Sequence, residues 1–101
     1  MRLGQDEIKA INSLAVKYFG NGAQVFLFGS RVDEDKKGGD IDLFIKNENE
    51  ESLTLENRIQ FLSELKIQIG DQKIDVVFDN AITRSKSSFY NSIQLHKTEL
   101  R

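Results

Sequence analysis

The sequence contains 101 residues, of which 39% are hydrophobic and 30% charged, and we expect a single globular domain over residues 1–101. The net charge of −2 argues against a protein dedicated to binding DNA, because such a protein needs a basic face to neutralise phosphates. The absence of cysteine excludes disulfides and thiolate chemistry, and the lack of a long apolar run or a secretory signal predicts a cytoplasmic protein without a membrane span.

The first third of the chain predicts a helix, a short strand and a polar loop. Apolar residues recur at three- and four-residue spacing over residues 5–19, which is typical of an amphipathic helix, and a glycine-rich turn at 20–22 ends it. Residues 24–28 are apolar on both faces of a strand, which favours a central place in a sheet. Residues 29–31, with the sequence Gly-Ser-Arg, break this strand, and a loop of mixed charge follows over 32–39.

The remaining chain predicts strand, helix, strand and helix. Residues 40–46 and 72–78 alternate in the manner of strands. A last helix is expected from about Ser85, although its serines weaken the pattern. Between the strands, residues 54–69 predict a long helix that begins at a Thr54 or Ser52 cap and has a stripe of Leu55, Ile59, Leu62, Leu65 and Ile69.

Two apolar residues of the long helix fall outside its stripe, and the single histidine of the chain has two possible roles. Phe61 and Ile67 lie off the stripe of the long helix, where they either widen its buried face or mark a surface for a partner. His96 is the single histidine, and its distance in sequence from the acidic motif indicates a surface or helix-end residue rather than a catalytic one.

Three carboxylates form the candidate catalytic and metal-binding site: Asp40, Asp42 and Asp75. The first two share one face of a strand, and the third lies opposite the apolar residues of another strand, so all three project to one side if both strands pack on the same helical layer. Two carboxylates about 5 Å apart repel by roughly 3 kcal/mol at an effective dielectric near 20. A divalent cation reverses this cost, and carboxylate oxygens suit Mg²⁺ or Mn²⁺.

A candidate nucleotide-binding segment precedes the acidic pair. Gly29 permits a close approach of the backbone to an anion, and Ser30 adds a hydroxyl donor. Arg31 can add a charged fork that binds phosphate oxygens. Each of these features is weak alone, and the specificity comes from their combination with the three carboxylates.

The combined pattern resembles the nucleotidyltransferase fold of the DNA polymerase beta superfamily. The hallmark of that fold is an apolar residue before Gly-Gly or Gly-Ser, a loop, an acidic-x-acidic pair and a later third carboxylate. In this chain the matching residues are Phe28-Gly29-Ser30, Asp40-Ile41-Asp42 and Asp75. The length of the chain and the sequence of these motifs look like those of the minimal nucleotidyltransferase (MNT) family. Two features depart from that family: Gly39 stands where Ser or Thr is common, and the loop is unusually acidic over 33–35.

The resemblance implies a fold and a function. The implied fold is α+β, with a small mixed three-stranded sheet, helices packed on one face, and the order α-β-β-α-β-α. The implied reaction transfers AMP from ATP to a hydroxyl, with two Mg²⁺ ions (or Mn²⁺) held by Asp40, Asp42 and Asp75. By the same resemblance Asp75 could accept the proton of the attacking hydroxyl, and Ser30 with the backbone around it would grip the phosphates.

The acceptor is expected to come from outside the chain. The chain resembles MNT proteins, a family that pairs with small helical HEPN toxins. The acceptor implied by this resemblance is a tyrosine of a HEPN protein, and the chain would act as an antitoxin. Self-association is the other way to complete the site. Two further functions stay open: a non-catalytic antitoxin or nucleotide-binding module, against which three converging carboxylates argue, and an aminoglycoside-like small-molecule nucleotidyltransferase, against which the missing second domain argues.

Overall fold

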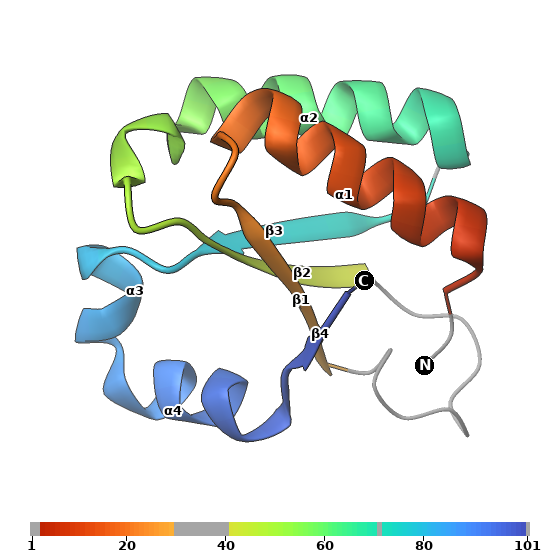
Figure 1. Cartoon of the computed structure of the whole chain (residues 1–101). Coiled ribbons are helices and arrows are strands. Elements are labelled where there is room, and N and C mark those ends of the chain that lie inside the picture. Colours follow the sequence, from red (N-terminus) through yellow and green to blue (C-terminus); the bar gives the residue numbers. More distant parts are fainter. Residues whose placement is uncertain (1–2, 30–40, 71, 101) are drawn as a thin grey trace.

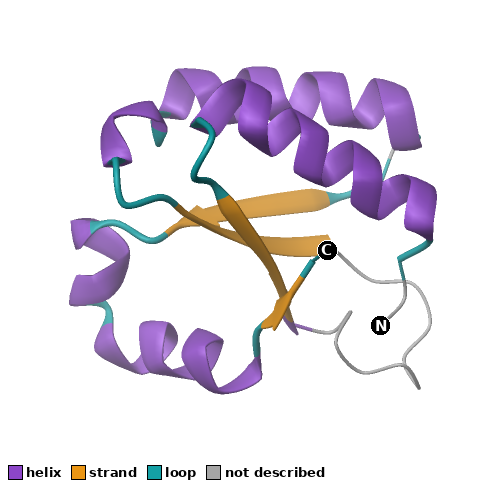
Figure 2. Cartoon of the chain, viewed as in Figure 1, coloured by secondary structure: helices purple, strands orange, loops and turns teal. Residues whose placement is uncertain are grey.

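The computed structural model describes residues 3–29, 41–70 and 72–100, and it shows one mixed sheet between two layers of helices (Figures 1 and 2). The sheet has the strand order β3-β2-β1-β4, with β1 antiparallel to β2 and β4, and with β2 parallel to β3. The elements are α1 (Gln5–Phe19), β1 (Gln24–Phe28), β2 (Ile41–Lys46), η2 (Glu50–Ser52), α2 (Leu55–Ile69), β3 (Ile74–Phe78), α3 (Ala81–Ser85), α4 (Ser87–His96) and β4 (Thr98–Glu99).

The helices cover both faces of the sheet. Helices α1 and α2 lie on one face and helices α3 and α4 lie on the other, as Figure 1 shows. Strand alternation explains both layers, because Leu43 points with its neighbours Ile41 and Ile45 into the α1–α2 core, whereas Phe44 points the opposite way and meets the ring of Tyr90 on α4 at 6.1 Å between centroids. A short chain therefore buries apolar residues on both sides of one sheet.

Three expectations about the architecture were wrong. The sheet has four strands instead of three, because residues 98–99 pair with Leu27 and Phe26 of β1, and a strand of two residues has no detectable alternation. The helices occupy two faces instead of one, since the apolar residues on the second face of the sheet also need a cover. The order of elements includes a short helix that was not expected, because Asn80 caps α3 by accepting a hydrogen bond from the Thr83 amide at 3.0 Å, whereas α4 begins at Ser87, close to the expected Ser85.

The α1–α2 layer holds the main core. Phe19 at the end of α1 is fully buried and packs against Phe61 at 5.0 Å and Phe78 at 5.3 Å between ring centroids. The helix expected over residues 5–19 and the strand expected over 24–28 are confirmed as α1 and β1. The expected cap of α2 is also confirmed, because Thr54 Oγ1 accepts a hydrogen bond from the Asn57 amide at 3.1 Å. In the described parts of the chain, no helix has the length and apolar character needed to cross a bilayer.

The expected stripe of α2 was wrong over its first half. Leu55 and Ile59 are 60% and 55% exposed, whereas Phe61 and Leu65 are fully buried. Phe61 therefore widens the buried face, while Ile67 is 83% exposed and belongs to the surface. Two apolar stripes overlap on this helix, and only packing against α1 and the sheet decides which one is buried.

Candidate active site

A row of cross-strand partners crosses the sheet on the α3–α4 face. Phe28 pairs with Asp42 in the antiparallel β1–β2 ladder, and Asp42 pairs with Asp75 in the parallel β2–β3 ladder. Register partners on adjacent strands point to the same face and lie about 5 Å apart. The two carboxylates that the sequence predicted on one face are therefore direct neighbours, a closer relation than alternation alone requires.

The two carboxylates differ in exposure. Asp42 is half-buried on the inner strand β2, and Asp75 is exposed on β3, which is an edge strand of the sheet. At about 5 Å, their mutual repulsion is roughly 3 kcal/mol at an effective dielectric near 20, and solvent around Asp75 lowers this value. The arrangement leaves one carboxylate positioned by the core and the other open to an incoming molecule.

Gly29 provides the close contact that links β1 to this pair. Its φ of 77° lies in the region that favours glycine, and a Cβ atom built on it would overlap Asp42 Oδ2 and stand 3.1 Å from Asp42 Cγ. Any side chain here would displace the carboxylate. The glycine backbone therefore lies directly beside Asp42, at the start of the segment that the sequence predicts to bind phosphate.

The carboxylate pair suits a hard divalent cation. No group of three His, Cys, Asp or Glu side chains that could hold a metal comes together among residues 3–29, 41–70 and 72–100. The pair of Asp42 and Asp75 supplies two oxygen ligands of the kind that Mg²⁺ uses, and Mg²⁺ commonly takes only one or two carboxylates and completes its shell with water and phosphate. Asp40, Ser30 and Arg31 lie outside the described residues.

A hydrogen-bonded cluster of Asp79, Arg84 and Tyr90, which the sequence did not indicate, holds the second helical layer to the sheet. Asp79, which follows β3, is 6% exposed, and its carboxylate accepts a hydrogen bond from Arg84 at 2.7 Å and one from the Tyr90 hydroxyl at 3.3 Å. The bond to Asp79 raises the pKa of Arg84, and burial followed by the nearby Asp79 charge raises the pKa of Tyr90. This cluster positions α3 and α4 over the row.

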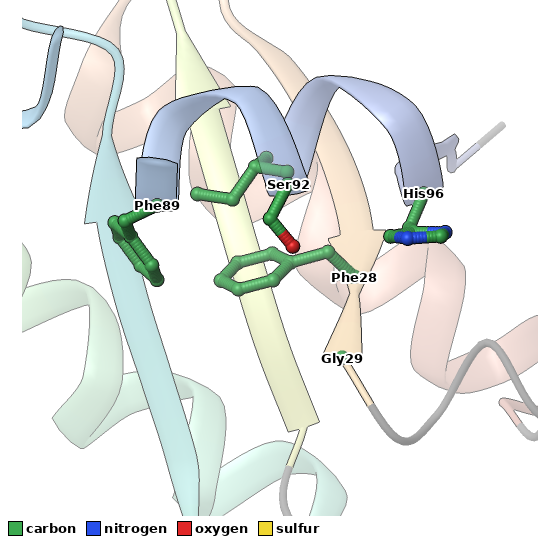
Figure 3. A pocket seen from close by; sticks show the side chains of 6 residues that line it. Phe28, Gly29, Phe89, Ser92 and His96 are labelled. Atoms are coloured by element: carbon green, nitrogen blue, oxygen red, sulfur yellow. The ribbon is translucent and has the colours of Figure 1, made fainter. Parts of the chain in front are cut away.

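A pocket opens where the row ends on β1. It has a volume of about 280 Å³ and lies between the end of β1 and α4, with a lining of Phe28, Gly29, Phe89, Ser92, Ile93 and His96 (Figure 3). Sequence reasoning missed this pocket because its two walls are about sixty residues apart, and no spacing rule relates a strand end to a distant helix. His96 is exposed at the end of α4, as expected, and it also lines this pocket.

Comparison with known proteins agrees with the geometry. The chain matches the family described as "Polymerase beta, Nucleotidyltransferase" over residues 9–99, a range that contains Gly29 and all three carboxylates of the motif. No significant match was found among curated proteins. The resemblance to the polymerase beta superfamily is thereby confirmed, and the described α+β fold fits it. The chain belongs to the polymerase beta nucleotidyltransferase family.

Proposed function

We propose that this nucleotidyltransferase is a minimal one that transfers AMP from ATP to a hydroxyl of a partner protein. The observation that carries the proposal is the register of Asp42 opposite Asp75, with the Gly29 backbone against the first of them. The two adjacent carboxylates repel each other, and a bound divalent cation would remove this cost. The same observation disfavours a non-catalytic antitoxin.

Each residue of the site has a distinct role in this reaction. When bound by Asp42, Asp75 and Asp40, two Mg²⁺ or Mn²⁺ ions supply stabilisation of charge on the attacking and leaving oxygens. The acceptor oxygen forms a bond to the α-phosphorus, the bond from that phosphorus to the bridging oxygen breaks, and pyrophosphate leaves. Asp75 takes the proton of the acceptor hydroxyl. Gly29, with Ser30 and Arg31, binds the phosphates of the donor.

The exposure of the β3 side supports a macromolecular acceptor. Asp75 lies on an edge strand, so a hydroxyl on a large molecule can approach it from solvent. A groove of about 400 Å³ lies beside β3, and its lining combines apolar with polar and charged residues: Val77, Phe78, Ile82, Phe89, Arg58, Asn80, Thr83 and Lys86. A surface that combines an exposed apolar side chain, such as Ile82 at 70% exposure, with polar and charged neighbours suits contact with a protein.

The resemblance to MNT proteins leads us to propose a small helical HEPN toxin as the partner. The chain would modify a tyrosine of that toxin in the cytoplasm and thereby act as its antitoxin, in agreement with the resemblance to MNT proteins. An aminoglycoside-like acceptor is less suitable, because a small polar molecule needs an enclosing pocket beside Asp75. Along this edge, the described residues form an open groove instead.

Label transfer tests the proposal. The protein is incubated with Mg²⁺ and α-labelled ATP, together with a purified HEPN partner or an aminoglycoside, and the products are separated. The proposal predicts label on the HEPN tyrosine, none on the aminoglycoside, and none with Asp42→Asn. Label on the aminoglycoside alone would overturn the protein acceptor. Strong neutralisation of the toxin by Asp42→Asn without any label would instead favour the non-catalytic antitoxin.

A further inference from the structure

The pocket between β1 and α4 is chemically different from the carboxylate site next to it. Phe28 forms one wall and Phe89 another, with 6.3 Å between ring centroids and planes at 76°. In Figure 3, Ser92 points from α4 toward Phe28, which lies beneath it, while Phe89 and His96 extend from the two ends of α4 on either side of Phe28. Among the residues that the structure describes, the lining of this pocket includes no Asp, Glu, Lys or Arg, so this part of the lining is uncharged.

The lining suits a neutral, planar, heteroaromatic ring. Phe89 is 43% exposed although it is a large apolar side chain, so part of its surface remains available for contact. Aromatic faces bind nucleobases by stacking, and the Ser92 hydroxyl and His96 imidazole can exchange hydrogen bonds with the polar edge of a base. A volume of about 280 Å³ is at the lower limit of small-molecule pockets, which favours one part of a nucleotide over a whole one.

The position of the pocket relates it to the reaction. Phe28 is the register partner of Asp42, and Gly29 both lines the pocket and lies against the Asp42 carboxylate. A molecule whose phosphates lie at Gly29 can therefore extend its uncharged end under α4. The opposite direction along the row leads from Asp42 to Asp75 and the open edge, where the acceptor can approach. Phe89 lines both the pocket and the groove on the β3 side, so this side chain lies between the two.

From this geometry we infer that the pocket binds the base of the donor nucleotide, which stacks on Phe89 and meets Ser92 and His96 with its polar edge. The inference rests on the proposed function, because it assumes that a nucleoside triphosphate is the donor. It assigns separate parts of the nucleotide to separate parts of the site: Gly29 and the carboxylates bind the phosphates, while α4 binds the base. It also predicts that discrimination among nucleotides depends on residues of α4.

Binding measurements with two ligands separate these parts. Titration calorimetry compares ATP with inorganic tripolyphosphate, both with Mg²⁺, on the wild-type protein and its variants. Phe89→Leu keeps an apolar side chain but removes the aromatic face, so we expect ATP binding to weaken by roughly 5- to 150-fold, the range for the loss of one stacked base. Tripolyphosphate binding should be unchanged, because its site does not include α4.

Matched variants on the same helix complete the design. Phe89→Tyr keeps the ring and should retain ATP affinity, and Leu95→Ala, at a residue that is 79% exposed and does not line the pocket, should change neither ligand. Ser92→Ala or His96→Ala should alter the ratio of affinities for ATP and GTP. Circular dichroism confirms that each variant is folded.

The results distinguish this inference from the proposed function. Equal ATP affinity in Phe89→Leu and wild type would overturn the base pocket, while label transfer that depends on Asp42 would still support the enzyme. Equal loss of ATP and tripolyphosphate binding would also overturn it, because the effect would then concern the phosphates. An absence of transfer with every acceptor, alongside selective loss of ATP binding in Phe89→Leu, would overturn the proposed function and leave the base pocket supported.

Discussion

Replacement of Gly29 by alanine tests whether this glycine is needed to leave room for the Asp42 carboxylate or only to allow a positive φ. A side chain at φ 77° is strained, and such backbone strain costs about 1–3 kcal/mol. The added Cβ also overlaps Asp42 Oδ2, so the carboxylate has to turn away from its place in the row. A displacement of about 1 Å in a reacting assembly can cost roughly 100-fold in rate. We expect a modest loss of stability and a large loss of AMP transfer.

Gly70 provides the matched control. It also has a positive φ of 97°, but a Cβ built there meets no atom within 4 Å. Gly70→Ala should therefore show the strain alone. Both variants should lower the thermal unfolding midpoint by about 4–24 °C, the range that corresponds to about 1–3 kcal/mol in a domain of this size. Transfer of label from ATP to the acceptor should decrease only in Gly29→Ala.

Two outcomes would refute this reasoning. Wild-type transfer by Gly29→Ala, together with the expected loss of stability, would mean that the position of the Asp42 carboxylate is unimportant for the reaction. An equal loss of transfer in Gly70→Ala would mean that general strain limits the assay. A double variant, Gly29→Ala with Asp42→Ala, removes the overlapping oxygen and should be more stable than Gly29→Ala alone.

Three further predictions concern the scaffold. Phe61→Ala should destabilise by about 3–5 kcal/mol in urea unfolding, because this side chain is fully buried, while Ile67→Ala at an 83% exposed position should change stability by less than about 0.5 kcal/mol; similar losses would contradict the assignment of the buried face. Asp79→Asn should cost about 1–3 kcal/mol by weakening a charged hydrogen bond, and an unchanged urea midpoint would show that the cluster does not hold α3 and α4. The Tyr18 hydroxyl donates a hydrogen bond to Glu64 at 2.5 Å and lowers the pKa of this carboxyl below its ordinary value of 4.5. The ionised Glu64 therefore stabilises the fold above pH 4.5, and this stabilisation is lost as the pH falls below that value through the lowered pKa. Glu64→Gln should reduce the loss of stability at acid pH, and stability curves that fall equally with pH in the wild type and the variant would contradict this.

Local patterns in the sequence predicted much of the site. The alternation of residues in the two strands placed Asp42 and Asp75 on one face, and the structure agrees. Alternation fixes only the phase of a strand, however, so it did not show that Asp42 is the direct partner of Asp75. That register depends on how the connection through α2 returns the chain to the sheet, which is a tertiary property.

Other features depend on packing that no local pattern records. The buried side of α2 could not be predicted because Phe61 and Ile59 belong to different apolar stripes of the same helix. The β1–α4 pocket could not be predicted because Phe28 and Phe89 meet only after the second helical layer folds over the sheet. Most of the motif was recognisable because Gly29, Asp40 and Asp42 lie within one short segment of the sequence.

The central claim is that Asp42 and Asp75 act together in one catalytic site. The most direct measurement is the single-turnover rate of AMP transfer from ATP in wild type, Asp42→Asn, Asp75→Asn and the double variant, with folding checked by circular dichroism. Residues that act as a unit are strongly non-additive, so we predict that each single variant loses nearly all transfer and that the double variant is little slower than either. Transfer at the wild-type rate by either folded single variant would contradict the claim.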